Sequence, residues 1–373
     1  MVQALSGRGK QGTGRPTARS SGGLGAGHRD PLAAADTGTE KKYPSWGSKK
    51  LFARLRRLHD SEKVPSRATI SRILKQFGLV KHRTRRRAKA GPERVDPRRL
   101  EPLWGNDVWG VDFKGWFRTG DGQKCHPLTI SDLYSRFIIH CDNLSSLALA
   151  PVWQSFERVF QQYGLPRAIR VDNGKPFAGG WVLGLTQLSV WWRLLGIQVD
   201  FIDPGKPYQN GTHERMHLSL KLEIANPPAR SLQAQRRRTT KWLRSFNEER
   251  PHEALGMKTP AEIYLASELK YHPVWPVEYD AEFEVRTVNS KGDIQWLNNR
   301  RFIGEAFQGQ RLGLRRYNDQ MHEVYLSDIL LGHLPAAHFC PFRPTVSKRK
   351  NERTASNDPS TEQLLTSTVL PKY

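Results

Sequence analysis

The chain has 373 residues, with 59 Lys and Arg against 36 Asp and Glu, so its formal net charge is +23. The length predicts two or three domains, and the charge predicts a polyanionic partner. The three cysteines, Cys125, Cys141 and Cys340, include no CxxC pair, which excludes a disulfide framework and a cysteine-based zinc finger. No apolar run approaches the ~18 residues of a membrane span, and residues 1–40 lack the apolar stretch of a signal peptide, so we expect a cytoplasmic protein without membrane contact.

Most of the excess charge lies in residues 41–100, which hold 20 Lys and Arg against 4 Asp and Glu. Such clustering is typical of a segment that grips nucleic acid. Residues 1–40 are rich in Gly, Ser, Ala and Arg and show no apolar periodicity, so they are predicted to form a disordered tail. The polar residues 344–373 predict a second disordered tail.

Residues 41–90 are predicted to form a helix-turn-helix followed by a basic linker. Leu51, Leu55 and Leu58 recur at helical spacing, and a second apolar stripe follows an N-cap at Ser66 and stops at Gly78. The second helix would turn basic side chains outward, toward DNA. The alternative is an ordinary helical hairpin with a solvated basic tail. The side chains expected to contact DNA here are Arg67, Arg72, Lys75, Arg85, Arg86 and Arg87.

Residues 100–265 predict a mixed α/β layer domain of order βββαβαβα. The predicted elements are three β-rich runs within 105–142, a helix over 152–163, a strand over 168–172, a Trp-rich helix over 181–195, a strand over 197–201 and a helical stretch over 212–246 interrupted at Pro227 and Pro228. We expect Trp181, Trp191 and Trp192 in its core. After a linker, short alternating runs with turn signals predict a small β-barrel over 278–335.

Three acidic residues stand where a mixed sheet would bring them together. Asp112 lies in the first β-run, Asp172 ends a predicted strand, and Glu214 lies in the first turn of a predicted helix. Three carboxylates would repel one another unless hard cations such as Mg²⁺ lay between them, and two such ions can support an in-line phosphodiester displacement. Other acids, namely Asp132, Asp142 and Asp203, also lie near predicted strand ends, so spacing alone does not select the trio.

Five ordered segments resemble the retroviral-integrase-like catalytic core of bacterial insertion-sequence transposases, the DDE class. They are WGVDFKGWF, PLTISDLYSRF, RVDNGKPF, LGIQVDFIDPGKPYQNGTHERMH and FNEERPHEALGMKTPAEIY. The resemblance, over about residues 40–335, implies an RNase H-like mixed-sheet core with an N-terminal helix-turn-helix and a C-terminal small β-barrel. It also implies that Asp112, Asp172 and Glu214 are the catalytic, metal-binding triad and that Lys221 contacts the DNA end.

The resemblance further implies the activity. A protein of this class would cleave at the ends of a mobile element and transfer the 3′-hydroxyls into target DNA, with Mg²⁺, or Mn²⁺ as its substitute, and no nucleotide. Its partners would be the terminal inverted repeats, the target DNA and further copies of itself, at the nucleoid in the bacterial cytoplasm. The alternative function is a catalytically decayed or co-opted sequence-specific DNA-binding protein.

The chain departs from the family pattern at two places. Asp172 and Glu214 are 42 residues apart, a few more than is commonest in retroviral integrases, and the extra length falls in AGGWVLGLTQLSVWW, which we interpret as a subfamily trait. Relatives usually begin with another helix-turn-helix where this chain has its Gly- and Arg-rich residues 1–40. Whether the chain is truncated there stays open at this point.

His213, Glu214 and His217 also match the HExxH pattern, in which two His hold zinc and Glu acts as the base of a protease. Nothing selects a third ligand among the possible residues Glu223, His252 and Glu253. A protease interpretation explains neither Asp112 and Asp172 nor the basic segment. A zinc protease is therefore only the remote alternative.

Overall fold

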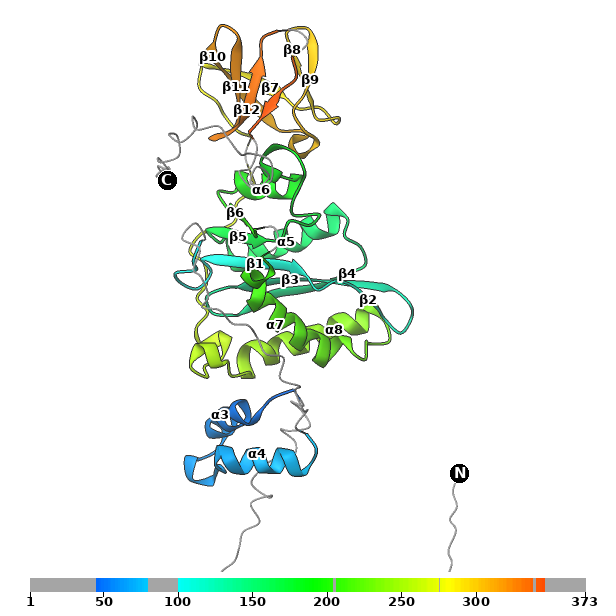
Figure 1. Cartoon of the computed structure of the whole chain (residues 1–373), viewed down its shortest axis with the longest axis vertical. Helices are drawn as coiled ribbons and strands as arrows, with labels where there is room; N and C mark the ends of the chain where they lie inside the picture. Colours follow the sequence, from blue (N-terminus) through cyan, green and yellow to red (C-terminus); the bar gives the residue numbers. More distant parts are fainter. Residues whose placement is uncertain (1–44, 80–99, 204–205, 275, 338–339, 346–373) are drawn as a thin grey trace, which may run out of the picture.

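The computed structural model describes residues 45–79, 100–203, 206–274, 276–337 and 340–345 (Figure 1). Along the chain these residues form a helical pair, an α/β core and a small β-domain. The predicted tail 1–40 and the predicted DNA-contacting residues Arg85, Arg86 and Arg87 lie outside the described residues. None of the described helices is long and apolar enough to cross a membrane.

The helical pair forms as the apolar spacing predicts. Its elements are α3 (Ser48–Leu58), the 3₁₀ turn η1 (Ser61–Lys63) and α4 (Arg67–Gln76). The Ser66 hydroxyl accepts a hydrogen bond from the Thr69 backbone N–H at 3.2 Å, which confirms the predicted N-cap. Leu58 and Phe77, by contrast, are exposed, because each lies at or just past the end of its helix, beyond the shared core. The buried residues of that core are Trp46, Leu51, Leu55, Ile70 and Leu74.

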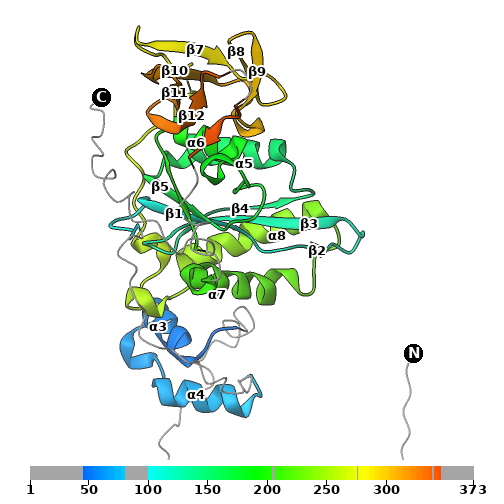
Figure 2. The same ribbon diagram turned by 45° about the horizontal axis from the view of Figure 1, so that its top comes forward.

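Ion pairs join α3 to the α/β core. Lys49 Nζ lies 2.9 Å from Glu253 Oε2, and Arg57 Nη1 lies 2.9 Å from Glu262 Oε2. Figures 1 and 2 show α3 on the side of the core and α4 beyond it. The basic side chains of α3 are thus directed at core carboxylates, whereas those of α4 remain exposed.

A mixed β-sheet forms the centre of the core. Its strands are β1 (Val108–Phe113), β2 (Phe117–Arg118), β3 (Lys124–Asp132), β4 (Ile138–Leu144), β5 (Ala168–Val171) and β6 (Gln198–Phe201). β3 pairs antiparallel with β1, β2 and β4, while β5 pairs parallel with both β1 and β6. The main order is therefore β4-β3-β1-β5-β6. This topology confirms the mixed α/β sheet predicted from the order of elements, and it agrees with the RNase H-like core that the resemblance implies.

Helices cover both faces of the sheet (Figure 1). They are α5 (Leu149–Tyr163), α6 (Gln187–Leu194), α7 (Gly211–Leu220) and α8 (Leu232–Arg244). Because side chains alternate along a strand, Trp109 and Val111 of β1 join the apolar core with α5 and α6, while Gly110 and Asp112 face α7. The α7 side has its own smaller core, in which Met216 and Trp242 pack on β4. Short helical turns complete the core: η2 (Val182–Gly184), η3 (Pro207–Asn210), the π-helical η4 (Lys221–Ala225) and η5 (Ser245–Glu249), η6 (Glu253–Leu255) and η7 (Pro260–Glu262).

The Trp-rich helix is shorter than the predicted 181–195. Leu183 and Gly184 have positive φ values of 51° and 73°, which break the helix, and Thr186 caps the new start with a capping box to Ser189. Trp191 and Trp192 are buried as predicted. The prediction that Trp181 is buried was wrong: its side chain is 49% exposed, and its indole N–H donates to the Ile303 carbonyl of the β-domain at 2.8 Å.

The β-domain consists of two small antiparallel sheets around one apolar core. Five strands pair in the order β13-β12-β11-β10-β7, and β8 pairs with β9. Among the described strands no pairing joins β13 to β7, so the closed barrel predicted for 278–335 stays a prediction. The elements are β7 (Phe283–Thr287), β8 (Asp293–Trp296), β9 (Asn299–Phe302), the turn η8 (Glu305–Phe307), β10 (Arg311–Asn318), β11 (Met321–Leu326), β12 (Ile329–Pro335) and β13 (Arg343–Pro344).

Replacing Gly110 by Ala should destabilise the protein by about 1–3 kcal/mol. An added Cβ would lie 2.7 Å from Leu133 Cδ2 and 2.8 Å from the His213 ring, so α7 would have to move away from β1. Urea denaturation measures the loss. Gly47→Ala is the control, since Gly47 has φ −84° and open space around the added atom. Equal denaturation midpoints for Gly110→Ala and the unchanged protein would contradict this packing.

Candidate active site

Strand pairing brings Asp112 and Asp172 to the same edge of the sheet. β1 and β5 are parallel, with Gly110 opposite Arg170, so the same register places Asp112 beside Asp172, the residue directly after β5. Side chains at equivalent positions of adjacent parallel strands point to the same face. Two of the three predicted acids are therefore neighbours because of backbone pairing alone.

The electrostatic environment of this pair is unusual. Burial, followed by the charge of Asp172, raises the pKa of Asp112 to about 7. Asn210 Nδ2 donates to Asp112 Oδ2 at 2.9 Å, and the Gly174 backbone N–H donates to Asp172 Oδ1 at 3.0 Å. Among the described residues, no Lys or Arg forms an ion pair with either carboxylate. Among the described residues, the two neighbouring acids thus have neutral hydrogen-bond donors and no Lys or Arg ion-pair partner.

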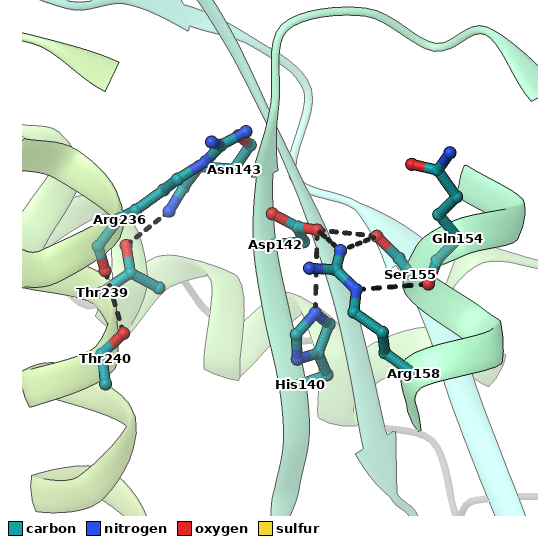
Figure 3. A network of polar contacts seen from close by, with 9 residues as sticks. All are labelled: His140, Asp142, Asn143, Gln154, Ser155, Arg158, Arg236, Thr239 and Thr240. Carbon is teal, nitrogen blue, oxygen red and sulfur yellow. Dashed lines mark hydrogen bonds and ion pairs between the residues drawn. The ribbon is translucent and has the colours of Figure 1, made fainter. Parts of the chain in front are cut away.

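Asp142, one of the three other acids near predicted strand ends, is engaged by neighbouring side chains instead. Its Oδ2 accepts hydrogen bonds from Ser155 Oγ and from Arg158 Nη2, both at 2.7 Å (Figure 3). Burial alone would raise the pKa of Asp142, but the neighbouring His140, the hydrogen bond from Ser155 and the charge of Arg158 hold it well below its usual range. The adjacent hollow of about 510 Å³ is lined by side chains of both charges, including Glu157, Arg158 and Arg236.

The other two of these acids are also engaged. Asp132 is buried and accepts hydrogen bonds from the Ser135 backbone N–H at 2.9 Å and from the Asn106 backbone N–H at 3.1 Å, so it stabilises a turn. Asp203 forms an ion pair with Lys206 at 2.9 Å. Spacing in the sequence did not distinguish these acids from Asp112 and Asp172, whereas their partners in the structure do.

Glu214 is not grouped with the acidic pair as a three-ligand metal site among the described residues. It lies in the first turn of α7, and its side chain is exposed. Its neighbours His213 and His217 occupy the helix face that packs on the sheet, and a residue next to His213 is turned by about 100° from that face. Within the described part of the chain, no three His, Cys, Asp or Glu side chains are grouped as a metal site. Glu214 therefore stays a predicted member of the triad.

Two integrase family models match this core. Both are described as integrase core domain, and they match residues 105–207 and 195–260. Asp112 and Asp172 lie in the first range and Glu214 in the second. The chain is 28% identical over 201 residues to the insertion element IS407 uncharacterized 31.7 kDa protein of Burkholderia multivorans, covering 52% of this chain and 67% of that protein. It is 30% identical over 213 residues to the insertion element IS476 uncharacterized 39.2 kDa protein of Xanthomonas euvesicatoria, covering 56% and 59%.

The chain is therefore similar to insertion-element proteins and carries an integrase core. These matches support a polynucleotidyl transferase of the DDE type. Solved structures that the chain matches include the HTLV-2 integrase catalytic core domain in complex with magnesium, with 16% identity, a TM-score of 0.35 and coverage of 44% of this chain and 100% of that one. Another is the simian T-cell lymphotropic virus intasome, with 15% identity, a TM-score of 0.39 and coverage of 84% and 98%.

The HExxH pattern of the chain does not form a zinc site. His213 and His217 are buried between α7 and the sheet, with their rings edge to face at 5.3 Å. Burial lowers the pKa of His213 to about 4 and that of His217 to about 2, so both rings are neutral at pH 7. Since Glu214 leaves the helix on another face, the three residues do not converge on one open position.

His217 instead supports Asp112 through Thr129, which sequence reasoning missed. Thr129 is the cross-strand neighbour of Asp112, and its hydroxyl donates to the Asp112 carbonyl at 2.9 Å. That hydroxyl also lies 2.8 Å from His217 Nε2. A hydroxyl has one proton to donate, so it accepts here and the proton of neutral His217 is on Nε2. The predicted antiparallel pairing of the first and second β-runs could have indicated that Thr129 lies opposite Asp112.

The predicted DNA contacts lie in two places. Arg67, Arg72 and Lys75 are exposed on α4, beyond α3 from the core (Figure 2). Lys221 is exposed directly after α7, one residue past the end of the helix that carries Glu214. The two sets of predicted contacts therefore lie on different elements, α4 and the end of α7.

Asp112→Asn should stabilise the metal-free protein above pH 7. The pKa of Asp112 is raised to about 7 from 3.8, so above pH 7 the folded protein carries a carboxylate charge that burial and Asp172 disfavour. The gain in the free energy of unfolding, at most about 4 kcal/mol, is complete above pH 7 and disappears as the pH falls toward 4, where Asp112 is protonated in both states.

Urea denaturation of both proteins in EDTA between pH 4 and 8 measures this difference. Glu157→Gln, which removes an acid from α5, is the control and should show no such pH-dependent gain. A wild-type protein at least as stable as Asp112→Asn at pH 8 would refute the repulsion between the two acids.

Proposed function

We propose that this protein cleaves DNA at the ends of a mobile element and joins the resulting 3′-hydroxyls to target DNA, with Asp112, Asp172 and Glu214 as its metal-binding triad. The observation that carries the proposal is the pair of neighbouring, part-buried carboxylates of Asp112 and Asp172 at one edge of an integrase core, without a Lys or Arg partner among the described residues. Water would be the first nucleophile and the DNA 3′-hydroxyl the second.

The donor set of the acidic pair fits a hard divalent cation. Carboxylate oxygens are the ligands that Mg²⁺ prefers, and the raised pKa of Asp112 reports repulsion and burial that a cation would relieve. Asp112 and Asp172 would hold Mg²⁺, or Mn²⁺ in its place, and Glu214 would complete the set. When bound, such ions activate an attacking oxygen and stabilise a leaving oxygen of the phosphodiester. No nucleotide is needed for this chemistry.

The residues around the pair would keep its oxygens in place during the reaction. Asn210 holds Oδ2 of Asp112, and the Gly174 backbone N–H holds Oδ1 of Asp172. The Thr129 hydroxyl anchors the Asp112 carbonyl and, through it, the end of β1. Fixed ligand positions raise affinity and reactivity because less reordering is needed when metal and DNA bind.

DNA binding would use the basic surfaces on either side of the acids. The exposed Arg67, Arg72 and Lys75 of α4, with Arg85, Arg86 and Arg87, would grip the terminal repeats by their phosphates, and Lys221 would contact the DNA end. Joining two ends to one target requires more than one copy of the protein on DNA. The bacterial nucleoid is where such a substrate lies.

One observation favours the alternative of a non-catalytic DNA-binding protein. Glu214 is exposed, and among the described residues no three His, Cys, Asp or Glu side chains are grouped as a metal site. Such a protein would still bind terminal repeats through α4. Metal-dependent cleavage separates the two possibilities.

Asp112→Asn, Asp172→Asn and Glu214→Gln should each abolish Mg²⁺-dependent nicking and joining of labelled duplexes that carry the element ends. Each change removes a charged oxygen ligand while the DNA-gripping surface is unchanged, so mobility-shift assays should show wild-type DNA binding. Glu157→Gln is the matched control and should cleave normally. Activity retained in Asp112→Asn or Asp172→Asn would overturn the proposal, and activity retained only in Glu214→Gln would remove Glu214 from the triad. Tight DNA binding by the wild type without cleavage would favour the non-catalytic alternative.

Arg72→Ala and Lys75→Ala should each weaken binding to element-end duplexes and reduce the slope of log K against log salt concentration by about 1, because each removes one phosphate contact. Fluorescence anisotropy over a series of KCl concentrations measures both quantities. Lys291→Ala removes an equally exposed charge from the β-domain and should change neither. Unchanged slopes in both α4 variants would exclude α4 from the DNA interface.

A further inference from the structure

An exposed aromatic side chain lies just past the catalytic strand. Trp116 follows β1 by three residues, and 58% of its surface is exposed. It precedes the hairpin of β2 and β3, which projects beside α8 (Figure 2). Exposure of one ring is common on protein surfaces, so its neighbours decide whether it can bind a ligand.

Two cations lie against this ring. Lys124 Nζ is 5.3 Å and Arg118 Cζ is 5.8 Å from the ring centroid of Trp116. Arg118 and Lys124 are opposite each other in the β2–β3 pairing, and both are exposed. No described carboxylate forms an ion pair with either cation. We call Trp116, Arg118 and Lys124 the hairpin patch.

The hairpin patch is attached to the core at its tip. The Gly120 backbone N–H donates to the Ala229 carbonyl at 2.9 Å, and the Asp121 backbone N–H donates to the Arg230 carbonyl at 2.8 Å. A Cβ at Gly120 would lie 3.1 Å from the Arg230 backbone, so a glycine permits this close approach. A surface held in place before binding loses less entropy when a ligand binds.

The hairpin patch is also close to the acidic pair along the chain. Trp116 is four residues after Asp112, a separation of at most about 14 Å. Lys114, between them, adds a positive charge that lowers the pKa of Asp112 against the larger effect of burial. Positive charge therefore continues from the acids to the ring.

We propose that the hairpin patch binds unpaired nucleotides of the DNA strand end next to the acidic pair, with one base stacked on Trp116 and its phosphates on Arg118 and Lys124. An aromatic face beside cations has the chemistry for a single strand, because every base has a π-face and every nucleotide a negative charge. A fully paired duplex offers no free base face. The proposal rests on the proposed function, because it takes DNA ends as the substrate.

Trp104 provides a matched comparison within the same chain. It is 53% exposed, but it lies before β1, at the end of the strand opposite to Asp112, and no described cation lies over its ring. The hairpin patch therefore differs from an ordinary exposed Trp in charge and in position.

The test uses short duplexes in EDTA, either blunt or ending in an unpaired overhang that contains 2-aminopurine. The wild type should change the 2-aminopurine fluorescence of the overhang and bind it more tightly than the blunt duplex. Trp116→Ala should lose the fluorescence change and about 5- to 150-fold of overhang affinity, the equivalent of ~1–3 kcal/mol of stacking, with blunt-duplex affinity unchanged. Trp116→Phe should retain most of both signals. Trp104→Ala should behave as the wild type.

Wild-type overhang binding and fluorescence in Trp116→Ala would overturn the proposal. An equal loss on blunt and overhang duplexes would overturn the stacking and leave a phosphate contact only. Because EDTA removes the metal, the outcome is separate from that of the proposed function. If the protein shows Trp116-dependent stacking but never cleaves DNA, the base-stacking proposal holds and the proposed function fails. If it cleaves DNA without such stacking, the proposed function holds and the base-stacking proposal fails.

Discussion

The parallel pairing of β1 with β5 is the constraint on which the rest of the active site depends. Its register places Asp112 beside Asp172, so two like charges become neighbours because of backbone hydrogen bonds. The cost of that repulsion is visible in the raised pKa of Asp112. Burial of Trp109, Val111 and Ile169 in the core on the other face stabilises the pairing against it.

The two faces of β1 have different tasks because side chains alternate along a strand. The face toward α5 and α6 is apolar and supplies stability. The face toward α7 carries Gly110, where the His213 ring packs, and then Asp112, whose carbonyl Thr129 holds. The two histidines of α7 are therefore packing and positioning residues next to the acids. A zinc site formed by His213 and His217 would therefore use side chains that already pack α7 against the sheet.

The basic residues of α3 and α4 have different surroundings, which the net charge of the chain does not reveal. Core carboxylates such as Glu253 and Glu262 pair with basic side chains of α3, while α4 keeps its basic residues exposed. Exposed ion pairs contribute little stability individually, yet together they orient the helical pair. A second positive surface, the hairpin patch, lies beyond the acids.

Local pattern determined the elements of this protein: the Ser66 cap, the break between α7 and α8 at Pro227 and Pro228, and the alternation that forms the sheet all depend on residues close in sequence. The resemblance to integrase cores selected the acids. Only the tertiary structure decided which acids have partners, because Asp142 meets Arg158, and Asp112 meets Asn210, through contacts between separate elements. It likewise left Trp181 and Glu214 exposed, since burial is decided by what packs opposite a residue and no local pattern contains that information.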